Sequence, residues 1–299
     1  MYYNLGIDAL MNEDLFEAYK NFEKAYLLYP SKRIEFLTKV TLLSIFYEKK
    51  EENRKNPWAY YVRYAQLNND PESAVLVTDL WGDLLDKYYF KSPDPDMIKK
   101  VYSQMLPYVT DSASLNKFKY NYYYSTAHYF DIKHKEDSSL VYLDSAYNLN
   151  TKDLLLQELV ENTVLGLLPA SLTLSVDVLA KLDEYFKRFP FLSMDGRLGE
   201  YYVWALSYKT SKLLESDKWE DGNASLMKLI NLMQQHSELL KKTGPYYTEA
   251  FLQVYYYYIR NKKYKEAKNF LEKTALKYLP DNEDVIRRIT SVNTILSNS

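Results

Sequence analysis

Histidine and carboxylate side chains recur at short spacing in one stretch of the 299-residue sequence. His128, Asp131 and His134 are spaced by threes, and two imidazoles with one carboxylate are ligands that suit Zn²⁺. The two histidines are six residues apart, which does not place both on one face of a helix, and His134 falls in the polar turn DIKHKED. Neither a fourth ligand nor supporting partners are indicated. We therefore expect no metal site here.

The paired carboxylates of the sequence do not have the surroundings of catalytic acids. Glu51/Glu52 and Asp94/Asp96 lie in polar connectors, without the apolar pocket that raises the pKa of such a group. The sequence also contains no phosphate-binding glycine loop, no G-x-S-x-G, no H-E-x-x-H and no dinucleotide fingerprint. The absence of cysteine excludes disulfides, thiolate metal sites and a cysteine nucleophile. We expect a protein that is not an enzyme and that needs no cofactor.

Three aspartates in TDLWGDLLDK form a possible binding surface. Asp79, Asp83 and Asp86 sit at i, i+4 and i+7, which is one face of a helix. Like charges placed this way usually mark a solvated face. The functional alternative is an acidic patch that receives a basic segment of a partner.

Composition limits both the fold and the partners. Hydrophobic residues make up 47% and charged residues 26% of the chain, and the formal net charge of −2 leaves no electrostatic footprint for nucleic acid or an anionic membrane. The most apolar stretch, 154–172, contains two glutamates and an asparagine, so no membrane-spanning helix is expected. Only 7 glycines and 10 prolines occur, against 32 tyrosines, whose rings can be buried while their hydroxyls reach water. A fold of helices packed in thin layers has many half-exposed side chains, for which tyrosine is well suited.

The helices that would position these side chains come in pairs. Residues 2–30 contain small and large residues at regular intervals, and the same spacing recurs at 121–150 and 249–280. In the first copy the positions are Tyr2, Leu5, Gly6, Ala9, Ala18, Phe22, Ala25 and Pro30. In the other two they are Tyr123, Thr126, Ala127, Phe130, Ser139, Leu143 and Ala146, then Phe251, Val254, Tyr255, Tyr258, Ala267, Leu271 and Thr274. Weaker copies lie at 57–71 and at Tyr201, Trp204, Ala205 and Tyr208.

These positions resemble the tetratricopeptide-repeat family, completely over 2–30 and largely over the other two strong copies. The resemblance implies an all-α fold: a right-handed superhelical α-solenoid of about seven antiparallel helix pairs plus a C-terminal capping helix, as one domain over 1–299. The pairs would be roughly 1–30, 31–70, 71–110, 111–150, 151–192, 193–243 and 244–280, with the cap at 281–299. Within the cap, Val285, Ile289, Val292 and Leu296 form an apolar stripe, and Arg287 and Arg288 are expected outward. The alternative is a generic helical bundle.

The family register also implies which residues line the concave groove. These are Tyr124, His128 and Asp131 in one copy, Tyr202, Leu206 and Lys209 in a second, and Tyr256 and Arg260 in a third. In the run of four tyrosines, Tyr255 and Tyr258 would pack on the partner helix and Tyr257 would face outward or the neighbouring pair. The alternative is that these aromatic residues only close a layered core.

The resemblance implies a protein–protein interaction scaffold that holds a peptide or a partner helix in its groove. One alternative is a glycan-binding module, with Trp58 and Trp219 stacking on sugar rings. Another is the input (sensor) domain of a membrane-linked transcriptional regulator, because EDSSLVYLDSAYNLN is similar to repeats of bacterial envelope lipoproteins and such regulators. We expect a protein or peptide partner and no nucleic acid. A homodimer through Tyr2 and Tyr3 is possible.

The start of the sequence bears on its context. A helical pattern begins at Tyr2 without a basic and apolar leader, which suggests a segment of a longer or processed protein. We expect a larger bacterial envelope or regulatory protein, with an extracytoplasmic location favoured over a cytoplasmic one.

Overall fold

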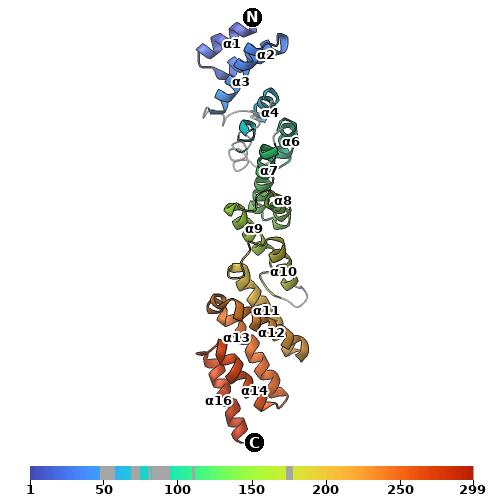
Figure 1. Ribbon diagram of the computed structural model, residues 1–299, viewed down its shortest axis with the longest axis vertical. Helices are drawn as coiled ribbons and strands as arrows, with labels where there is room; N and C mark the ends of the chain where they lie inside the picture. Colours follow the sequence, from blue (N-terminus) through green and yellow to red (C-terminus); the bar gives the residue numbers. More distant parts are fainter. Residues whose placement is uncertain are drawn as a thin grey trace. The chain divides into compact units, whose positions relative to one another are not determined.

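The computed structural model describes residues 1–47, 58–68, 75–79, 82, 95–109, 112–172 and 178–298. These residues form helices and contain no strand, which confirms the expected all-α class (Figure 1). The chain divides into two compact units, Met1–Thr163 and Val164–Ser299, which we describe separately. The expected breaks at Asp70-Pro71 and Thr110-Asp111 lie outside the described residues.

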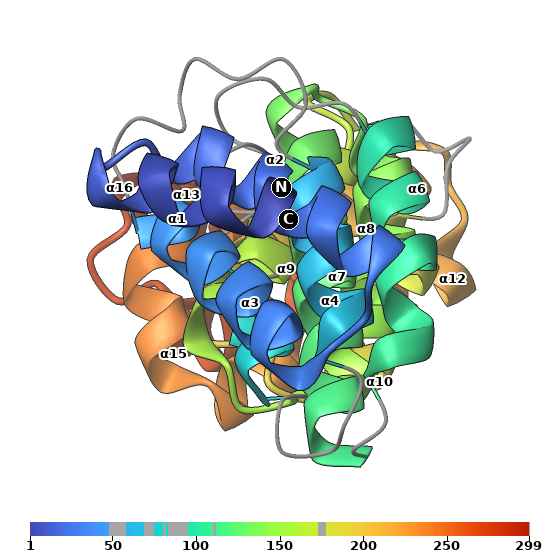
Figure 2. The ribbon, with the colours of Figure 1, turned by 90° about the horizontal axis from the view of Figure 1, so that it is seen from above.

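The helices of the first unit pack mainly on their neighbours in sequence. Figures 1 and 2 show α1 beside α2 and α7 beside α8, and α3 packs on α2. The elements are α1 (Tyr2–Met11), α2 (Leu15–Leu28), α3 (Lys32–Tyr47), α4 (Trp58–Leu67), α6 (Pro95–Met105), α7 (Ser112–Ile132), α8 (Glu136–Leu149) and the first part of α9 (Leu154–Leu167). A short 3₁₀ turn, Leu106–Tyr108, follows α6.

The second unit contains the end of α9 and five longer helices. These are α10 (Val178–Arg188), α11 (Arg197–Glu215), α12 (Trp219–Gln235), α13 (Ser237–Arg260) and α16 (Glu283–Ser297). Between the last two, α14 (Tyr264–Phe270) continues through a π-helical turn at Leu271–Ala275 into α15 (Leu276–Tyr278). Helix α11 packs against both α12 and α13, so it is the central helix of this unit.

Four of the helix pairs are joined by one and the same turn. In each turn a non-glycine residue is left-handed, with φ of 58° at Glu13, 52° at His134, 57° at Asp217 and 57° at Lys262. In each, the next residue donates its N–H to the carbonyl five residues earlier, as Asp14 does to Ala9 at 3.0 Å. This is a Schellman-type helix ending. The left-handed residue therefore gives the four pairs a common reference point from which positions can be counted.

Counted from that residue, the same positions are buried in each pair. The residue five places later is small and buried: Ala18, Ser139, Gly222 and Ala267. The residue nine places later is large and at most 3% exposed: Phe22, Leu143, Leu226 and Leu271. Small residues are needed because the helices approach closely; a Cβ atom on Gly222 would lie 2.7 Å from Cδ2 of Leu214.

Helix α11 has a different register from the one expected. Counting from Asp217 places Leu206, Lys209, Thr210 and Leu213 where the earlier copy has Tyr123, Thr126, Ala127 and Phe130. This is five residues later than the expected Tyr201, Trp204, Ala205 and Tyr208. The reason is the length of α11, which continues to Glu215, so that the turn is short and WEDGN already belongs to α12.

The boundary expected at 243/244 is also displaced. Helix α13 begins at Ser237 and runs through Gly244 and Pro245 without a break. The junction with α12 is instead at His236, whose Nδ1 lies 2.9 Å from Oδ1 of Asp195 in the segment before α11. A glycine and a proline in sequence therefore do not interrupt this helix.

A helix, α16, is present where the C-terminal cap was expected. Val285 and Val292 are fully buried, and Ile289 and Leu296 pack against the same core. Arg287 is exposed, as expected, but Arg288 is not directed outward. Its guanidinium carbon lies 5.3 Å from the centre of the Tyr256 ring, because a planar guanidinium packs favourably over an aromatic ring.

Candidate functional site

The second unit has a pocket bounded by three helices. Its volume is about 350 Å³, and Leu179 of α10 with Leu206 and Leu213 of α11 provides apolar walls. The lining residues are Leu179, Leu206, Lys209, Leu213, Asp221, Ala224, Ser225 and Lys228. Such a mixture of aliphatic walls and a few polar groups is typical of a binding site.

The charged side chains of the pocket are not engaged within the protein. Lys209 is half-buried, and Asp221 and Lys228 are exposed. None of the three forms an ion pair or hydrogen bond with the part of the chain that the structure describes. By contrast, Lys212, one turn after Lys209, donates to Glu215 at 2.7 Å, and this bond raises the pKa of Lys212. The pocket thus offers two free ammonium groups and one carboxylate.

A buried pair of hydroxyls holds one polar lining residue in place. Oγ1 of Thr210 and Oγ of Ser225 are 2.8 Å apart, and Oγ1 of Thr210 also lies 2.8 Å from the carbonyl oxygen of Leu206. Both side chains are almost fully buried. This contact ties α11 to α12 at the pocket, so its shape depends on the packing of those two helices.

Two of the three residues predicted on α11 line this pocket. They are Leu206 and Lys209. The third, Tyr202, lies one turn earlier on α11 and donates its hydroxyl to Oδ1 of Asp183 on α10 at 3.0 Å. The structure therefore brings this predicted set to the side of α11 that faces α10.

The residues predicted on α7 lie along one side of that helix in the first unit. The rings of Tyr120 and Tyr124 are stacked at 5.9 Å, and the ring of His128 is 6.4 Å from that of Tyr124. Asp131 accepts a hydrogen bond from Thr163 of α9 at 3.3 Å. His134 is in the turn, as expected.

Tyr120 connects the same side of α7 to the start of α9. Its hydroxyl donates to Oδ2 of Asp153 at 2.7 Å, and the other oxygen of Asp153 accepts from the backbone of Leu156 at 3.1 Å. Burial, and then the bond to Asp153, raises the pKa of Tyr120 far above its usual value. Of the predicted residues of α7, Asp131 thus takes part in a contact with α9, and Tyr120 makes a second contact on the same side of the helix.

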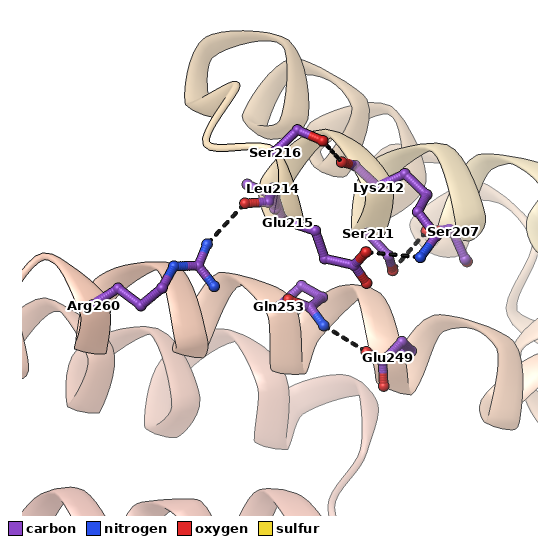
Figure 3. A network of polar contacts seen from close by, with 9 residues as sticks. All are labelled: Ser207, Ser211, Lys212, Leu214, Glu215, Ser216, Glu249, Gln253 and Arg260. Atoms are coloured by element: carbon purple, nitrogen blue, oxygen red, sulfur yellow. Dashed lines mark hydrogen bonds and ion pairs between the residues drawn. The ribbon is translucent and has the colours of Figure 1, made fainter. Parts of the chain in front are cut away.

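Arg260 and Tyr256 also connect neighbouring helices. Nη2 of Arg260 donates to the carbonyl oxygen of Leu214 at 2.9 Å, at the end of α11 (Figure 3), and to Oδ1 of Asp217 at 3.1 Å. The hydroxyl of Tyr256 accepts from Nη2 of Arg288 on α16 at 2.7 Å. Both predicted groove residues therefore take part in packing between pairs.

The other three tyrosines of the run are packed as well. Tyr255 is 5% exposed, and Tyr258 lies against Phe270 and Trp219. Tyr257 faces the preceding pair, where its ring stacks on that of Trp219 at 4.3 Å. One face of Trp219 is therefore covered by the protein itself.

The acidic face predicted in the first unit is described only in part. Asp79 is exposed and pairs with Lys117 of α7 at 2.5 Å. Asp83 and Asp86 lie outside the described residues.

Sequence reasoning missed most of the pocket. Leu179, Leu213, Asp221 and Lys228 were not expected to contribute, because three helices must come together before their side chains share one cavity. One feature of the sequence indicates the pocket: Lys209 is charged, whereas the equivalent residues of the other copies, Leu5, Thr126 and Val254, are not.

One class of site and one class of segment are not found among the described residues. No group of three or more histidine, aspartate or glutamate side chains in those ranges could hold a metal ion. No helix within them is long and apolar enough to cross a membrane.

Comparisons with known proteins were made for the whole chain. No protein-family model matches it, and a search of curated proteins finds no significant match.

Proposed function

We propose that the protein is a non-catalytic scaffold that binds a segment of another protein. The observation that carries this proposal is the pocket between α10, α11 and α12, which combines aliphatic walls with lysines that no described residue neutralises. Protein interiors and surfaces normally pair or solvate such charges, so a half-buried free lysine beside leucines marks a place where a partner can supply the opposite charge.

The repeated turn and the repeated buried positions support a tetratricopeptide-like architecture. Pairs built alike expose similar faces, and stacking them buries a continuous core. The packing of α16 on the last full pair supports its role as the cap of an α-solenoid. The contacts of Asp131 with Thr163 and of Arg260 with Leu214 would hold successive pairs together.

The chemistry of the pocket favours binding over catalysis. Ser225 is hydrogen-bonded to Thr210, and no histidine or carboxylate among the described residues bonds to it and would activate it as a nucleophile. The two amines and the carboxylate at the pocket suit recognition of a charged segment. We expect that partner to be a peptide segment, since aliphatic anchors with a charged rim are how proteins commonly hold one another.

Selection of binding peptides from a random displayed library tests this function. The full chain is the target, and the Lys209→Glu/Lys228→Glu variant reports on the pocket. Lys273→Glu is the matched control, because Lys273 is exposed and holds the position of Lys228 in the last full pair, eleven residues after the left-handed residue. Selected peptides should bind wild type and control alike and the double variant at least tenfold more weakly.

Two results would contradict the proposal. If repeated selections return no peptide that binds the wild-type chain with a measurable affinity, the proposed scaffold function is wrong. Peptides that bind the double variant as tightly as the wild type would show that this pocket is not the binding site.

A further inference from the structure

Lys209 departs from the pattern of the other helix pairs. It stands eight residues before the left-handed residue, where the other three copies have Leu5, Thr126 and Val254. Thr126 and Val254 are 3% and 1% exposed, and Leu5, in the first pair, is 41% exposed. Packing alone therefore favours an uncharged side chain at this position, and a half-buried ammonium there costs desolvation energy.

Lys209 has no paired anion among the residues that the structure describes. No described residue pairs with it or with Lys228. The carboxylate of the pocket, Asp221, lies in the first turn of α12, where the positive end of the helix dipole already favours its charge. Two ammonium groups and one carboxylate leave an excess of one positive charge beside the leucine walls.

We infer that this pocket takes an aliphatic side chain together with a neighbouring carboxylate of a partner segment, and that Lys209 selects the carboxylate. The inference rests on the proposed scaffold function. About 350 Å³ is at the low end of ligand pockets, which span roughly 300–1,000 Å³, so it suits a few atoms of an extended segment and not a docked helix. Leu179 and Leu213, which are only partly buried, contact the aliphatic group, and Lys209 and Lys228 contact the carboxylate.

The probe is the capped peptide acetyl-Gly-Leu-Glu-Gly-amide, and its isosteric control carries Gln in place of Glu. Titration into methyl-labelled full-length protein is followed by NMR at the methyl groups of Leu179, Leu206 and Leu213. The Glu peptide should shift these signals in a saturable way. The Gln peptide should bind about twofold to fivefold more weakly, the effect expected of a solvent-accessible charge contact.

The Lys209→Leu variant isolates the selecting residue. It introduces the side chain that Leu5 provides at the same position of the first pair, so it should fold. We expect it to lose most of the preference for the Glu peptide, with only the contribution of Lys228 left. Lys228→Gln should reduce the preference for Glu, and Lys273→Gln should leave it unchanged.

The outcomes separate this inference from the scaffold function. If library peptides bind wild type through the pocket but Lys209→Leu keeps the full preference for Glu, the scaffold function stands and this inference is wrong. The same holds if the Glu and Gln peptides bind wild type equally. If neither probe shifts the methyl signals and the library yields no binder, both fail.

Discussion

Replacing Arg260 by alanine should destabilise the second unit and leave peptide binding intact. Its guanidinium donates to the carbonyl oxygen of Leu214 and to Asp217, at the end of α11. The Arg260 and Asp217 side chains are 43% and 69% exposed, so their ion pair contributes at most about 1 kcal/mol. A cation at a helix C-terminus adds about 0.3–1 kcal/mol. The expected loss in free energy of unfolding is about 1–1.5 kcal/mol.

Urea unfolding, followed by circular dichroism and tryptophan fluorescence, measures this loss. Trp219 is a suitable reporter because its ring stacks on Tyr257 of α13, the helix that carries Arg260. Arg287→Ala is the matched control: Arg287 is exposed and pairs with Asp284 on its own helix, so its removal should cost less than about 0.5 kcal/mol.

A double-mutant cycle with Asp217→Asn separates the ion pair from the bond to the carbonyl oxygen. The coupling between Arg260 and Asp217 should be below about 1 kcal/mol, with the remaining loss coming from Leu214. The reasoning would be refuted by an Arg260→Ala protein that unfolds like the wild type but no longer binds the selected peptides. That result would return Arg260 to the binding groove.

Three further predictions concern the scaffold. Lys262→Gly should raise the free energy of unfolding by up to about 1 kcal/mol, because Lys262 is left-handed and glycine adopts this conformation without strain; a loss in a urea titration would contradict this. Gly222→Ala should lower it by about 1 kcal/mol, because the clash with Leu214 exceeds the gain in helix propensity; equal thermal stability to wild type would show that Leu214 moves aside at no cost. Burial raises the pKa of both Tyr102 and Tyr122 to about 12 from an ordinary 10. The neutral phenols therefore contribute fully to the free energy of unfolding below pH 10, and this contribution is lost as the pH rises towards 12. A Tyr102→Phe/Tyr122→Phe protein should keep its helical circular dichroism to higher pH than wild type, and identical alkaline transitions would contradict the assigned burial.

Local pattern was enough to predict much of the fold. The turn at His134 and the apolar stripe of α16 lie where the sequence places them, because each depends on residues within one helix pair. The register of α11 could not be found in this way. Tyr201, Trp204 and Tyr208 satisfy the aromatic spacing, but the length of the helix after them decides which residues meet α12.

The candidate site was predicted in part and for a reason that needs revision. Leu206 and Lys209 were named from a register that the structure shifts by five residues, yet both line the pocket. Tyr124, Tyr256 and Arg260 were expected at an open groove, and the structure shows each of them in contact with other side chains or with a neighbouring helix. Polar and aromatic residues serve such contacts and ligand binding equally well, so spacing alone does not distinguish the two uses.

The links between neighbouring pairs have a consequence for how the chain folds. Arg260 and Leu214 are 46 residues apart in sequence, and Arg288 and Tyr256 are 32 apart, so these contacts close short loops. Low contact order of this kind favours fast folding, because little chain entropy is lost before the contacts form. Each helix pair can fold soon after it leaves the ribosome by packing on the pair that precedes it. The apolar surface of the second unit is fully buried only when α16 packs on it.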